Sequence, residues 1–289
     1  MPLSRTISFS SLRLPDGSSV RFPAVMGVLN VTPDSFSDGG CYLDPDSALE
    51  HALEMEAAGA AIIDVGGESS RPSGATEVSV EVELRRVEPV LERLQGRLRV
   101  PISIDTRKAS VARAAIERGA MIINDTSALE ADPGMAELAA KSRCAVLLMH
   151  MKGGPADHIK FARYRDVVGE VARYLKARSQ FAIKAGIARS RIILDPGIGF
   201  AKTAEHNLKI LGGLPKICAL GYPVLVGASR KSFVRRIAGE SEADILFGTA
   251  AVNALAIAAG VSIIRVHDPG PAAAVVRMGK AIAAMTGRA

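Results

Sequence analysis

Residues 25–40, VMGVLNVTPDSFSDGG, decide how the rest of the chain is interpreted. An apolar run, Ala24 to Leu29, covers the start of this stretch and has the length of one buried strand. From Asn30 onward the stretch is polar, and Pro33 and the glycine pair at its end argue against a helix. A buried strand that ends in a dense group of oxygen and amide side chains is typical of an active-site loop, and a long polar surface loop is the alternative.

Short, Ile-rich strands recur along the chain, and glycines end the helical segments that precede them. Gly59, Gly119, Gly186 and Gly260 mark four of these helix ends. Regular alternation of strands and helices predicts a parallel sheet, and eight units favour a closed barrel over an open sheet. The expected strands are residues 24–29, 61–65, 100–104, 121–124, 145–149, 192–195, 223–226 and 262–265, and the expected helices are residues 44–58, 79–95, 109–118, 132–142, 164–185, 205–213, 242–259 and 271–285.

The predicted fold class is therefore α/β, a (β/α)8 TIM barrel with an N-terminal β-hairpin. The hairpin is expected within residues 1–23, where Pro15-Asp16-Gly17 forms the turn between two alternating segments. We interpret the whole chain, residues 1–289, as a single barrel domain. Its length suits this interpretation, because one α/β barrel commonly has about 250 residues.

The composition excludes several classes of protein. Hydrophobic residues make up 48% of the chain and aromatic residues only 4%, which suits an aliphatic core around buried parallel strands. The net charge is +6, but the 36 basic residues are scattered, so no nucleic-acid partner is expected. Three cysteines without paired spacing indicate a reducing compartment. Neither a signal peptide nor a membrane-spanning segment is found, so a cytoplasmic protein without a membrane partner is predicted.

Every predicted strand ends at a polar or charged residue. In a parallel barrel the carboxyl ends of the strands meet at one rim, where barrel enzymes place their sites. In a purely structural interpretation, Asp64 ties its glycine-rich loop and Asp125 braces the loop that follows it. In the same interpretation His150 packs in the core and Lys202 lies on the surface. The strand-end groups are Asn30, Asp64, Asp105, Asn124 with Asp125, His150, Asp195, Ser229 with Arg230 and Lys231, and Arg265 with His267.

These residue types favour a ligand that combines a heterocycle, a phosphate-bearing group and a second anion. Carboxylate and amide oxygens can accept the N–H groups of an amino-substituted heterocycle. Arginine and histidine side chains at the rim can donate to phosphate or carboxylate, and the helix start expected after Lys231 can receive an anion. Asn30 or Asp34 can hold Mg²⁺, which bridges phosphate oxygens. No spacing indicates a covalent nucleophile.

The sequence resembles the dihydropteroate synthase family over nearly the whole chain. Residues 29–39, LNVTPDSFSDG, are similar to the family's first signature, and residues 63–72, IDVGGESSRP, to its second. The resemblance implies a transferase of folate biosynthesis that condenses (7,8-dihydropterin-6-yl)methyl diphosphate with 4-aminobenzoate, giving 7,8-dihydropteroate and diphosphate. It also implies Mg²⁺ as cofactor, a pterin-binding barrel and a homodimer. Further family motifs are matched, in order, at residues 104–106, 123–125, 148–151, 194–200, 229–232 and 265–268.

The resemblance also assigns roles to individual residues. Asp105, Lys231, Asn30 and Asp34 are the implied catalytic residues, and Asn30 is the implied metal ligand. The pterin is expected at Asp105, Asn124, Asp195, Lys231, Met149, Gly227 and Arg265, the diphosphate at Asn30, Arg71, Arg265 and His267, and the aminobenzoate at Ser70, Arg71, Pro72, Phe200, Lys231 and Ser232.

Some positions depart from the family's usual residues, and two other functions remain open. The departures are Ser70, the run Thr126-Ser127-Ala128, Gly154 and Ala201. A pterin-binding methyltransferase domain would share the barrel and its pterin contacts, but it would not need the metal–diphosphate loop at Asn30. A non-catalytic basic binding protein would instead show salt-dependent binding of nucleic acid.

Overall fold

Eight parallel strands form the central sheet, in the order β8-β7-β6-β5-β4-β3-β10-β9. The structure, a computed structural model, describes residues 10–32, 44–68, 78–154 and 158–285. An isolated parallel bridge between Leu194 and Val224 joins the two ends of this sheet, so the predicted barrel is confirmed. The strands are β3 (Ala24–Asn30), β4 (Ile62–Gly66), β5 (Ile102–Asp105), β6 (Ala120–Asp125), β7 (Ala145–Met149), β8 (Ile192–Asp195), β9 (Leu225–Val226) and β10 (Ile263–Val266).

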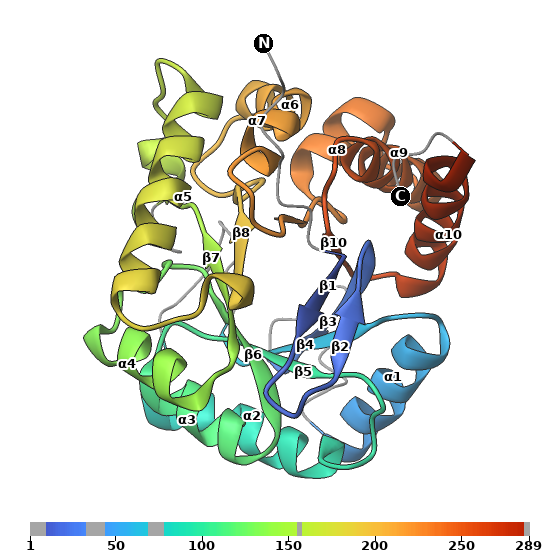
Figure 1. Ribbon diagram of the computed structural model, residues 1–289. Helices are drawn as coiled ribbons and strands as arrows, with labels where there is room; N and C mark the ends of the chain where they lie inside the picture. The colour runs from blue at the N-terminus through green and yellow to red at the C-terminus, as the bar shows by residue number, and fades with distance from the viewer. Residues whose placement is uncertain (1–9, 33–43, 69–77, 155–157, 286–289) are drawn as a thin grey trace.

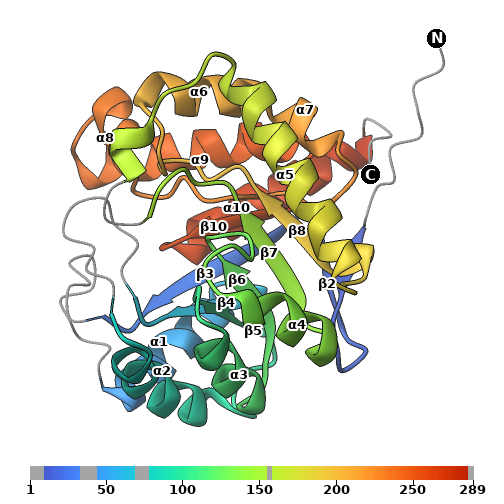
Figure 2. The same cartoon turned by 90° about the vertical axis from the view of Figure 1, so that its left-hand side faces the viewer.

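Helices surround the barrel and connect successive strands (Figure 1 and Figure 2). Helix α1 begins where the Asp44 carboxylate accepts from the Ser47 amide at 2.9 Å and Pro45 occupies the first turn. Thr203 and His206 form a capping box at the start of α6. The helices are α1 (Pro45–Ala57), α2 (Val80–Leu94), α3 (Ala109–Glu117), α4 (Pro133–Ser142), α5 (Val167–Lys184), α6 (Ala204–Gly212), α7 (Leu214–Cys218), α8 (Ser232–Ala238), α9 (Glu242–Ala258) and α10 (Pro269–Met285), with 3-10 turns η2 (His158–Phe161) and η3 (Arg189–Arg191).

Two apolar layers hold the barrel together. The larger cluster lies between the strands and the helices, and the smaller one fills the inside of the barrel. The predicted N-terminal hairpin is formed by β1 (Ser11–Arg13) and β2 (Ser19–Arg21), and its Leu12, Leu14 and Val20 belong to the inner cluster. Because apolar layers cover both faces of the sheet, the strands are apolar along most of their length. The inner strand residues include Met26, Ile62, Ile122, Leu147, Met149, Ile193, Leu225 and Ile263.

The parallel register brings the last residues of neighbouring strands into one row. Asn30 pairs with Gly66, Gly66 with Asp105, and Asp105 with Asn124. Strands β7 and β8 also end in register with each other, at Asp195. The polar strand ends are therefore neighbours at one rim of the barrel, as the alternation of strands and helices predicts.

Two features bear on the cellular setting. No single helix in the described ranges is long and apolar enough to cross a membrane, and one bent pair, α8 with α9 at 108°, passes by length and composition only. Cys144 is buried and Cys218 is partly buried, and both are free thiols.

One aspartate fixes the starts of two helices at once. The Asp132 Oδ1 atom accepts from the Gly134 amide at 2.8 Å, which caps α4. Its Oδ2 atom accepts from the Ala109 amide at 2.8 Å, in the first turn of α3. Lys108, which precedes α3, makes no side-chain cap of its own, so Asp132 supplies the missing acceptor from the neighbouring unit.

We expect Asp132→Ala to lower the free energy of unfolding by about 1–2 kcal/mol, because both helix starts lose an acceptor. Denaturant unfolding measures this change. Asp46→Ala, in the exposed first turn of α1, is the matched control and should change the free energy by less than about 0.5 kcal/mol. Equal effects of the two substitutions would contradict a double cap at Asp132.

Candidate active site

Gly66 lies at the centre of the row of strand ends, with polar side chains on both sides of it. A Cβ atom on Gly66 would lie 3.7 Å from Asn30 Oδ1 and 3.9 Å from Asp105 Oδ2. The Asn30 and Asp105 side chains therefore face the same point above β4. Of the predicted residues, these two are brought together as expected, at the carboxyl ends of β3 and β5.

Arg265 connects two carboxylates across the inside of the barrel. Its Nε donates to Asp64 Oδ2 at 2.7 Å, and one terminal nitrogen donates to Asp105 Oδ2 at 2.9 Å. Asn124 Nδ2 donates to the same Asp64 oxygen at 2.9 Å. Asp64 is fully buried, and its other oxygen, Oδ1, has no partner among the residues that the structure describes. The four side chains form one network across β4, β5, β6 and β10, and Asp64 holds the donors rather than its own loop.

The environment of Asp105 favours the protonated acid. Burial raises the pKa of Asp105 to about 7, with Arg265 opposing the rise and Asp64 adding to it through repulsion between like charges. Burial lowers the pKa of Arg265, but its two carboxylate partners outweigh that effect and raise it. Arg265 is thus a fixed cation between two acids, while Asp105 titrates near neutral pH.

The second predicted group joins Asp195, at the carboxyl end of β8, to Lys231, which follows β9 and precedes α8. Asp195 Oδ1 accepts from the Gly197 amide at 2.6 Å, and burial raises its pKa. Lys231 Nζ donates to the Ile198 carbonyl and lies 4.4 Å from the centre of the Phe200 ring. Burial lowers the pKa of Lys231 to about 8, opposed by Asp195 and assisted by Arg265. This lysine is therefore a cation at neutral pH with a readily exchanged proton.

The backbone of the loop after β8 makes room for Lys231. A Cβ atom on Gly199, whose φ is +84°, would lie 2.8 Å from Lys231 Cδ. A glycine is needed at this position both for the left-handed conformation and for the close approach of the lysine. The loop thereby brings Phe200 and Lys231 together, as predicted for one ligand pocket.

The loops after β9 and β10 are tied to each other. The Ser229 hydroxyl accepts from the His267 amide at 3.2 Å and lies 3.2 Å from His267 Nδ1. Arg230 forms a two-bond pair with Asp268, at 3.0 and 2.8 Å. Ser232 is exposed at the first position of α8, so the helix start expected after Lys231 is confirmed.

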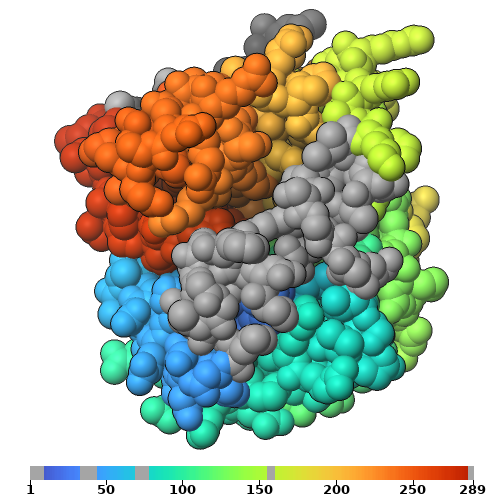
Figure 3. All heavy atoms as spheres, turned by 180° about the vertical axis from the view of Figure 1, so that it is seen from behind, coloured from blue at the N-terminus to red at the C-terminus, as the bar shows by residue number. Residues whose placement is uncertain are grey.

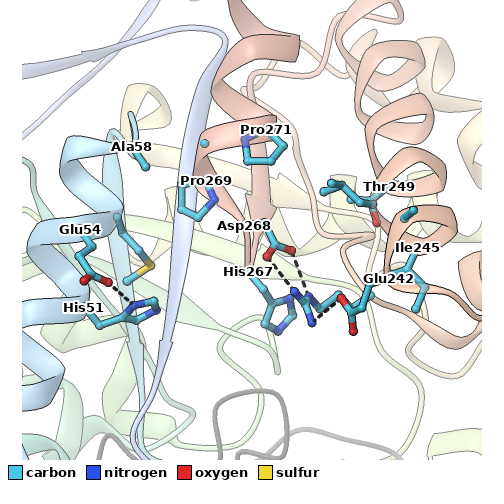
Figure 4. Close-up of a pocket in the computed structure, with 15 residues that line it drawn as sticks. His51, Glu54, Ala58, Glu242, Ile245, Thr249, His267, Asp268, Pro269 and Pro271 are labelled. Carbon is cyan, nitrogen blue, oxygen red and sulfur yellow. Dashed lines mark hydrogen bonds and ion pairs between the residues drawn. The ribbon is translucent and has the colours of Figure 1, made fainter.

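A cavity of about 460 Å³ borders the outer side of this region (Figure 4). Helix α1 contributes His51 and Glu54, α9 contributes Glu242 and Thr249, and His267 lies at the start of the connection to α10. The cavity therefore reaches the site at His267, between helices that lie far apart in the sequence.

The remaining predicted residues fall into two groups. Met149 is buried in the inner cluster, and Gly227 lies beside Arg265, since a Cβ atom on it would be 3.6 Å from Arg265 Cβ. Asp34, Ser70, Arg71 and Pro72 lie outside the described residues.

The structural interpretations have different outcomes. Asp125 does brace its loop, since its carboxylate accepts from the Ser127 amide and hydroxyl and from the Leu129 amide. His150 is packed in the core, as one reading of its apolar neighbours predicts. The surface position of Lys202 is wrong: it is 9% exposed, and its Nζ lies among backbone carbonyls. The motif around it, Phe200 to Thr203, shows no apolar periodicity that marks burial.

A second buried lysine was not singled out from the sequence. Lys108 Nζ donates to Glu68 and, at 2.5 Å, to the fully buried Glu83, and Arg107 donates to Glu68 at 2.7 Å. The partners come from two neighbouring units of the barrel and lie 25 and 40 residues from Lys108, so no local spacing could reveal this cluster. The cluster holds Glu68, in the segment that follows β4.

The fold and these side chains define a class of protein. A (β/α)8 barrel with buried acids, a fixed arginine and a buried lysine at the carboxyl ends of its strands has the build of a barrel enzyme. Residues 26–267 match the family described as pterin binding enzyme. A dihydropteroate synthase of Synechocystis sp. is 45% identical over 245 residues, which cover 84% of each chain. The chain therefore belongs to the pterin binding enzyme family, and its relatives are dihydropteroate synthases.

Solved structures agree with this assignment. The dihydropteroate synthase of Yersinia pestis, in a sulfonamide drug complex, matches with a TM-score of 0.90 and 41% identity, covering 95% of this chain and 99% of that one. The dihydropteroate synthase of Xanthomonas albilineans, in complex with 7,8-dihydropteroate, matches with a TM-score of 0.83 and 40% identity over 95% of this chain and 99% of that one. The barrel and hairpin described above are thus those of this family.

We expect Asp105 to make the free energy of unfolding depend on pH. Folding raises its pKa from the ordinary 3.8 to about 7, so the stabilisation by this group is complete at low pH and is lost as the pH rises through 7. Relative to Asp105→Asn, the wild-type protein should lose up to about 1.4 kcal/mol for each pH unit between about pH 4 and about pH 7. Denaturant unfolding of both proteins across this range measures the difference, and parallel pH profiles would contradict the raised pKa.

Proposed function

We propose that this chain carries out the dihydropteroate synthase reaction, with the pterin held over the network of Asn124, Asp64, Arg265 and Asp105. The family assignment supports the reaction, and the 7,8-dihydropteroate bound to the Xanthomonas albilineans relative is its product. The observation that carries the proposal is the buried network itself, since Arg265 bridges Asp64 and Asp105 at 2.7 and 2.9 Å.

Binding of the pterin uses acceptors that the network leaves available. An aminopyrimidinone ring has several N–H donors, and carboxylate oxygens accept them well inside a barrel of low dielectric. Asp105, Asn124 and Asp195 supply carboxylate and amide groups at the ends of three strands. Lys231 and Arg265 donate to the ring's carbonyl oxygen and nitrogens, and Met149 and Gly227 line the ring's faces.

The diphosphate is held by Arg265 and His267, with Arg71 from the segment outside the described residues. Arg265 is a permanent cation in this site, and His267 is oriented by Ser229 through two contacts of 3.2 Å. Cations in these positions stabilise the negative charge that develops on diphosphate as it departs.

Asn30 is the residue of this chain that would hold Mg²⁺. Its Oδ1 faces the open space above Gly66, and Mg²⁺ uses few protein oxygens when substrate phosphates and water complete its shell. No group of three or more His, Cys, Asp or Glu able to hold a metal occurs within the described part of the chain. Bound Mg²⁺ supplies further positive charge to the phosphate oxygens. Asp34, the other expected ligand, lies outside the described residues.

Departure of diphosphate leaves positive character on the pterin methylene carbon, and we assign Asp105 to oppose it in its ionised form, which predominates above its pKa of about 7. At about 4 Å and an effective dielectric constant near 20, one opposite charge contributes about 4 kcal/mol. This corresponds to roughly three powers of ten in rate. The amine of 4-aminobenzoate is a weak nucleophile, so an electrophile that is already cationic favours its attack.

Phe200, Lys231 and Ser232 form the described side of the aminobenzoate pocket. The Phe200 ring offers an apolar wall under Lys231 Nζ, and Lys231 remains charged at neutral pH because its pKa is about 8. A cation beside an aromatic wall suits a ligand that has a benzene ring and a carboxylate. Ser70, Arg71 and Pro72 are expected to complete the pocket.

We expect the protein to form 7,8-dihydropteroate and diphosphate from the two substrates, and to do so only with Mg²⁺ present. The measurement is chromatography of the coupled product with parallel detection of diphosphate, with Mg²⁺ or with chelator. Absence of coupled product under both conditions would contradict the proposed function, and pterin methyl transfer without diphosphate release would assign the alternative.

The role of Asp105 is tested by Asp105→Asn, which removes the charge and keeps the shape of the side chain. Loss of the carboxylate should lower kcat by more than tenfold and by up to about a thousandfold. A loss below tenfold in a folded variant would remove Asp105 from its assigned role.

We also propose that two copies associate through the outer face of α9 and α10, which lie side by side on one flank of the molecule (orange and red in Figure 3). Phe247 and Leu255, two turns apart on α9, are 71% and 72% exposed. Met278 and Ile282, one turn apart on α10, are 64% and 58% exposed. Large apolar side chains gathered on neighbouring helices are typical of an interface, and the family resemblance implies a homodimer.

The cytoplasmic location stays a prediction.

Sedimentation equilibrium should give twice the chain mass of 30.3 kDa. Leu255→Glu should shift the protein toward monomer, because it places a charge within an apolar interface. Leu208→Glu, at a 49% exposed position on α6, is the matched control and should leave the mass unchanged. A monomeric wild-type protein, or equal effects of the two variants, would contradict this interface.

A further inference from the structure

Lys202 is a buried lysine that none of the proposed substrate contacts uses. Its Nζ donates to the Phe200 carbonyl at 2.8 Å and to the His150 carbonyl at 3.3 Å, and it lies 3.0 Å from His150 Nδ1. An ammonium group has three N–H donors, and three acceptors surround it here. The side chain therefore joins the loop after β8 to the end of β7.

Burying a lysine is unfavourable, so a buried lysine at this position calls for a local structural reason. Burial lowers the pKa of Lys202 well below its ordinary value, the charges of Lys231 and Lys152 act in the same direction, and Asp195 opposes them. A buried polar contact of this kind adds little net stability to a fold, and its better-supported role is to fix one local geometry. The geometry in question is that of the loop that Lys202 holds.

That loop, residues 196–203, has an unusual backbone. Gly197, Gly199 and Ala201 have φ values of +67°, +84° and +50°, all in the left-handed region. Ala201 is the departure from the family's usual glycine, and a side chain at a left-handed position costs roughly 1–2 kcal/mol. The loop therefore needs external contacts to keep its conformation.

Each part of the loop has such a contact. The Gly197 amide donates to Asp195 Oδ1 at 2.6 Å, and the Gly199 amide donates to Asn207 Oδ1 at 2.8 Å. The third contact is Lys202 Nζ on the Phe200 carbonyl. Without Lys202, the Phe200 carbonyl would lose its tie to the end of β7.

The other end of the contact is rigid. The His150 amide donates to the Asp195 carbonyl at 2.9 Å, and the His150 ring packs edge-on against Tyr174 at 4.9 Å between centres. Burial lowers the pKa of His150 to about 2, with Lys202 acting in the same direction, so the imidazole stays neutral. A Cβ atom on Gly197 would lie only 2.0 Å from the His150 carbonyl oxygen, which shows how closely loop and strand end approach.

We propose that Lys202 is a positioning residue for 4-aminobenzoate: its buried amine anchors the Phe200 carbonyl to the end of β7 and so places the Phe200 ring under Lys231. The inference rests on the proposed function. The same loop presents the Ile198 carbonyl that accepts from Lys231, so both elements of the aminobenzoate pocket depend on the loop's shape. Of the pterin contacts, Asp105 and Asn124 lie on other strands, whereas Asp195 and Lys231 touch the loop, so a smaller effect is expected on the pterin than on 4-aminobenzoate.

The test is steady-state kinetics of Lys202→Met with each substrate varied in turn. Loss of Nζ removes the donor that joins the Phe200 and His150 carbonyls, and the loop relaxes. The KM for 4-aminobenzoate should rise by about tenfold or more, while the KM for the dihydropterin diphosphate should change by less than about threefold. Lys202→Gln keeps a donor and should give an intermediate KM for 4-aminobenzoate.

The controls separate positioning from stability and from the proposed function. Lys209→Met, at an exposed position on α6, should have wild-type constants. An unchanged KM for 4-aminobenzoate, or equal changes in both KM values, overturns the role of Lys202; if Lys202→Met does not fold, the same criteria apply to Lys202→Gln. If the wild-type protein forms no product, the proposed function fails, and calorimetric titration of each variant with 4-aminobenzoate then decides whether Lys202 acts on that ligand, by the same tenfold criterion.

Discussion

The pair of bonds from Arg265 to Asp64 and Asp105 is the interaction on which the rest of the site depends. It joins β10 to β4 and β5, and with Asn124 it reaches β6, so four strands share one polar network inside an otherwise apolar barrel. Two acids facing each other would repel in this environment, and the arginine between them opposes the rise that burial and this repulsion cause in the pKa of Asp105, which is about 7. Breaking the network would leave buried charges unpaired, which costs far more than a surface ion pair is worth.

The sequence predicts the barrel well because its signals are local and repeated. In four units a glycine ends the helix and an Ile-rich strand follows, as at Gly119 and residues 121–123, so these units can be recognised by themselves. The barrel then follows from the count of units. The five-residue helix α7 is missed because so short an element carries no periodicity.

The site residues also divide into those that local sequence signals predict and those that they do not. Asp64, Asp105, Asn124 and Asp195 are found because each stands at the end of an apolar run, where the strand itself marks the position. Lys202 and the cluster of Lys108 with Glu83 follow no strand directly, and each has a partner on another unit of the barrel. Burial of a charged side chain far from any apolar pattern is a property of the assembled fold, and a linear reading treats such residues as surface groups. The raised pKa of Asp105 also could not be predicted from the sequence, because it reflects burial in the assembled barrel and charged neighbours on three strands.

The closure of the barrel has a consequence for substrate entry. Between β8 and β9 the sheet is joined by the single bridge of Leu194 with Val224, and β9 has only two residues. Asp195 stands on one side of this seam, and Gly227 and Lys231 follow on the other. The two halves of the ligand site therefore meet where the backbone ladder is thinnest, so a substrate that enters there is met by side chains, with Lys231 crossing the seam to the Ile198 carbonyl.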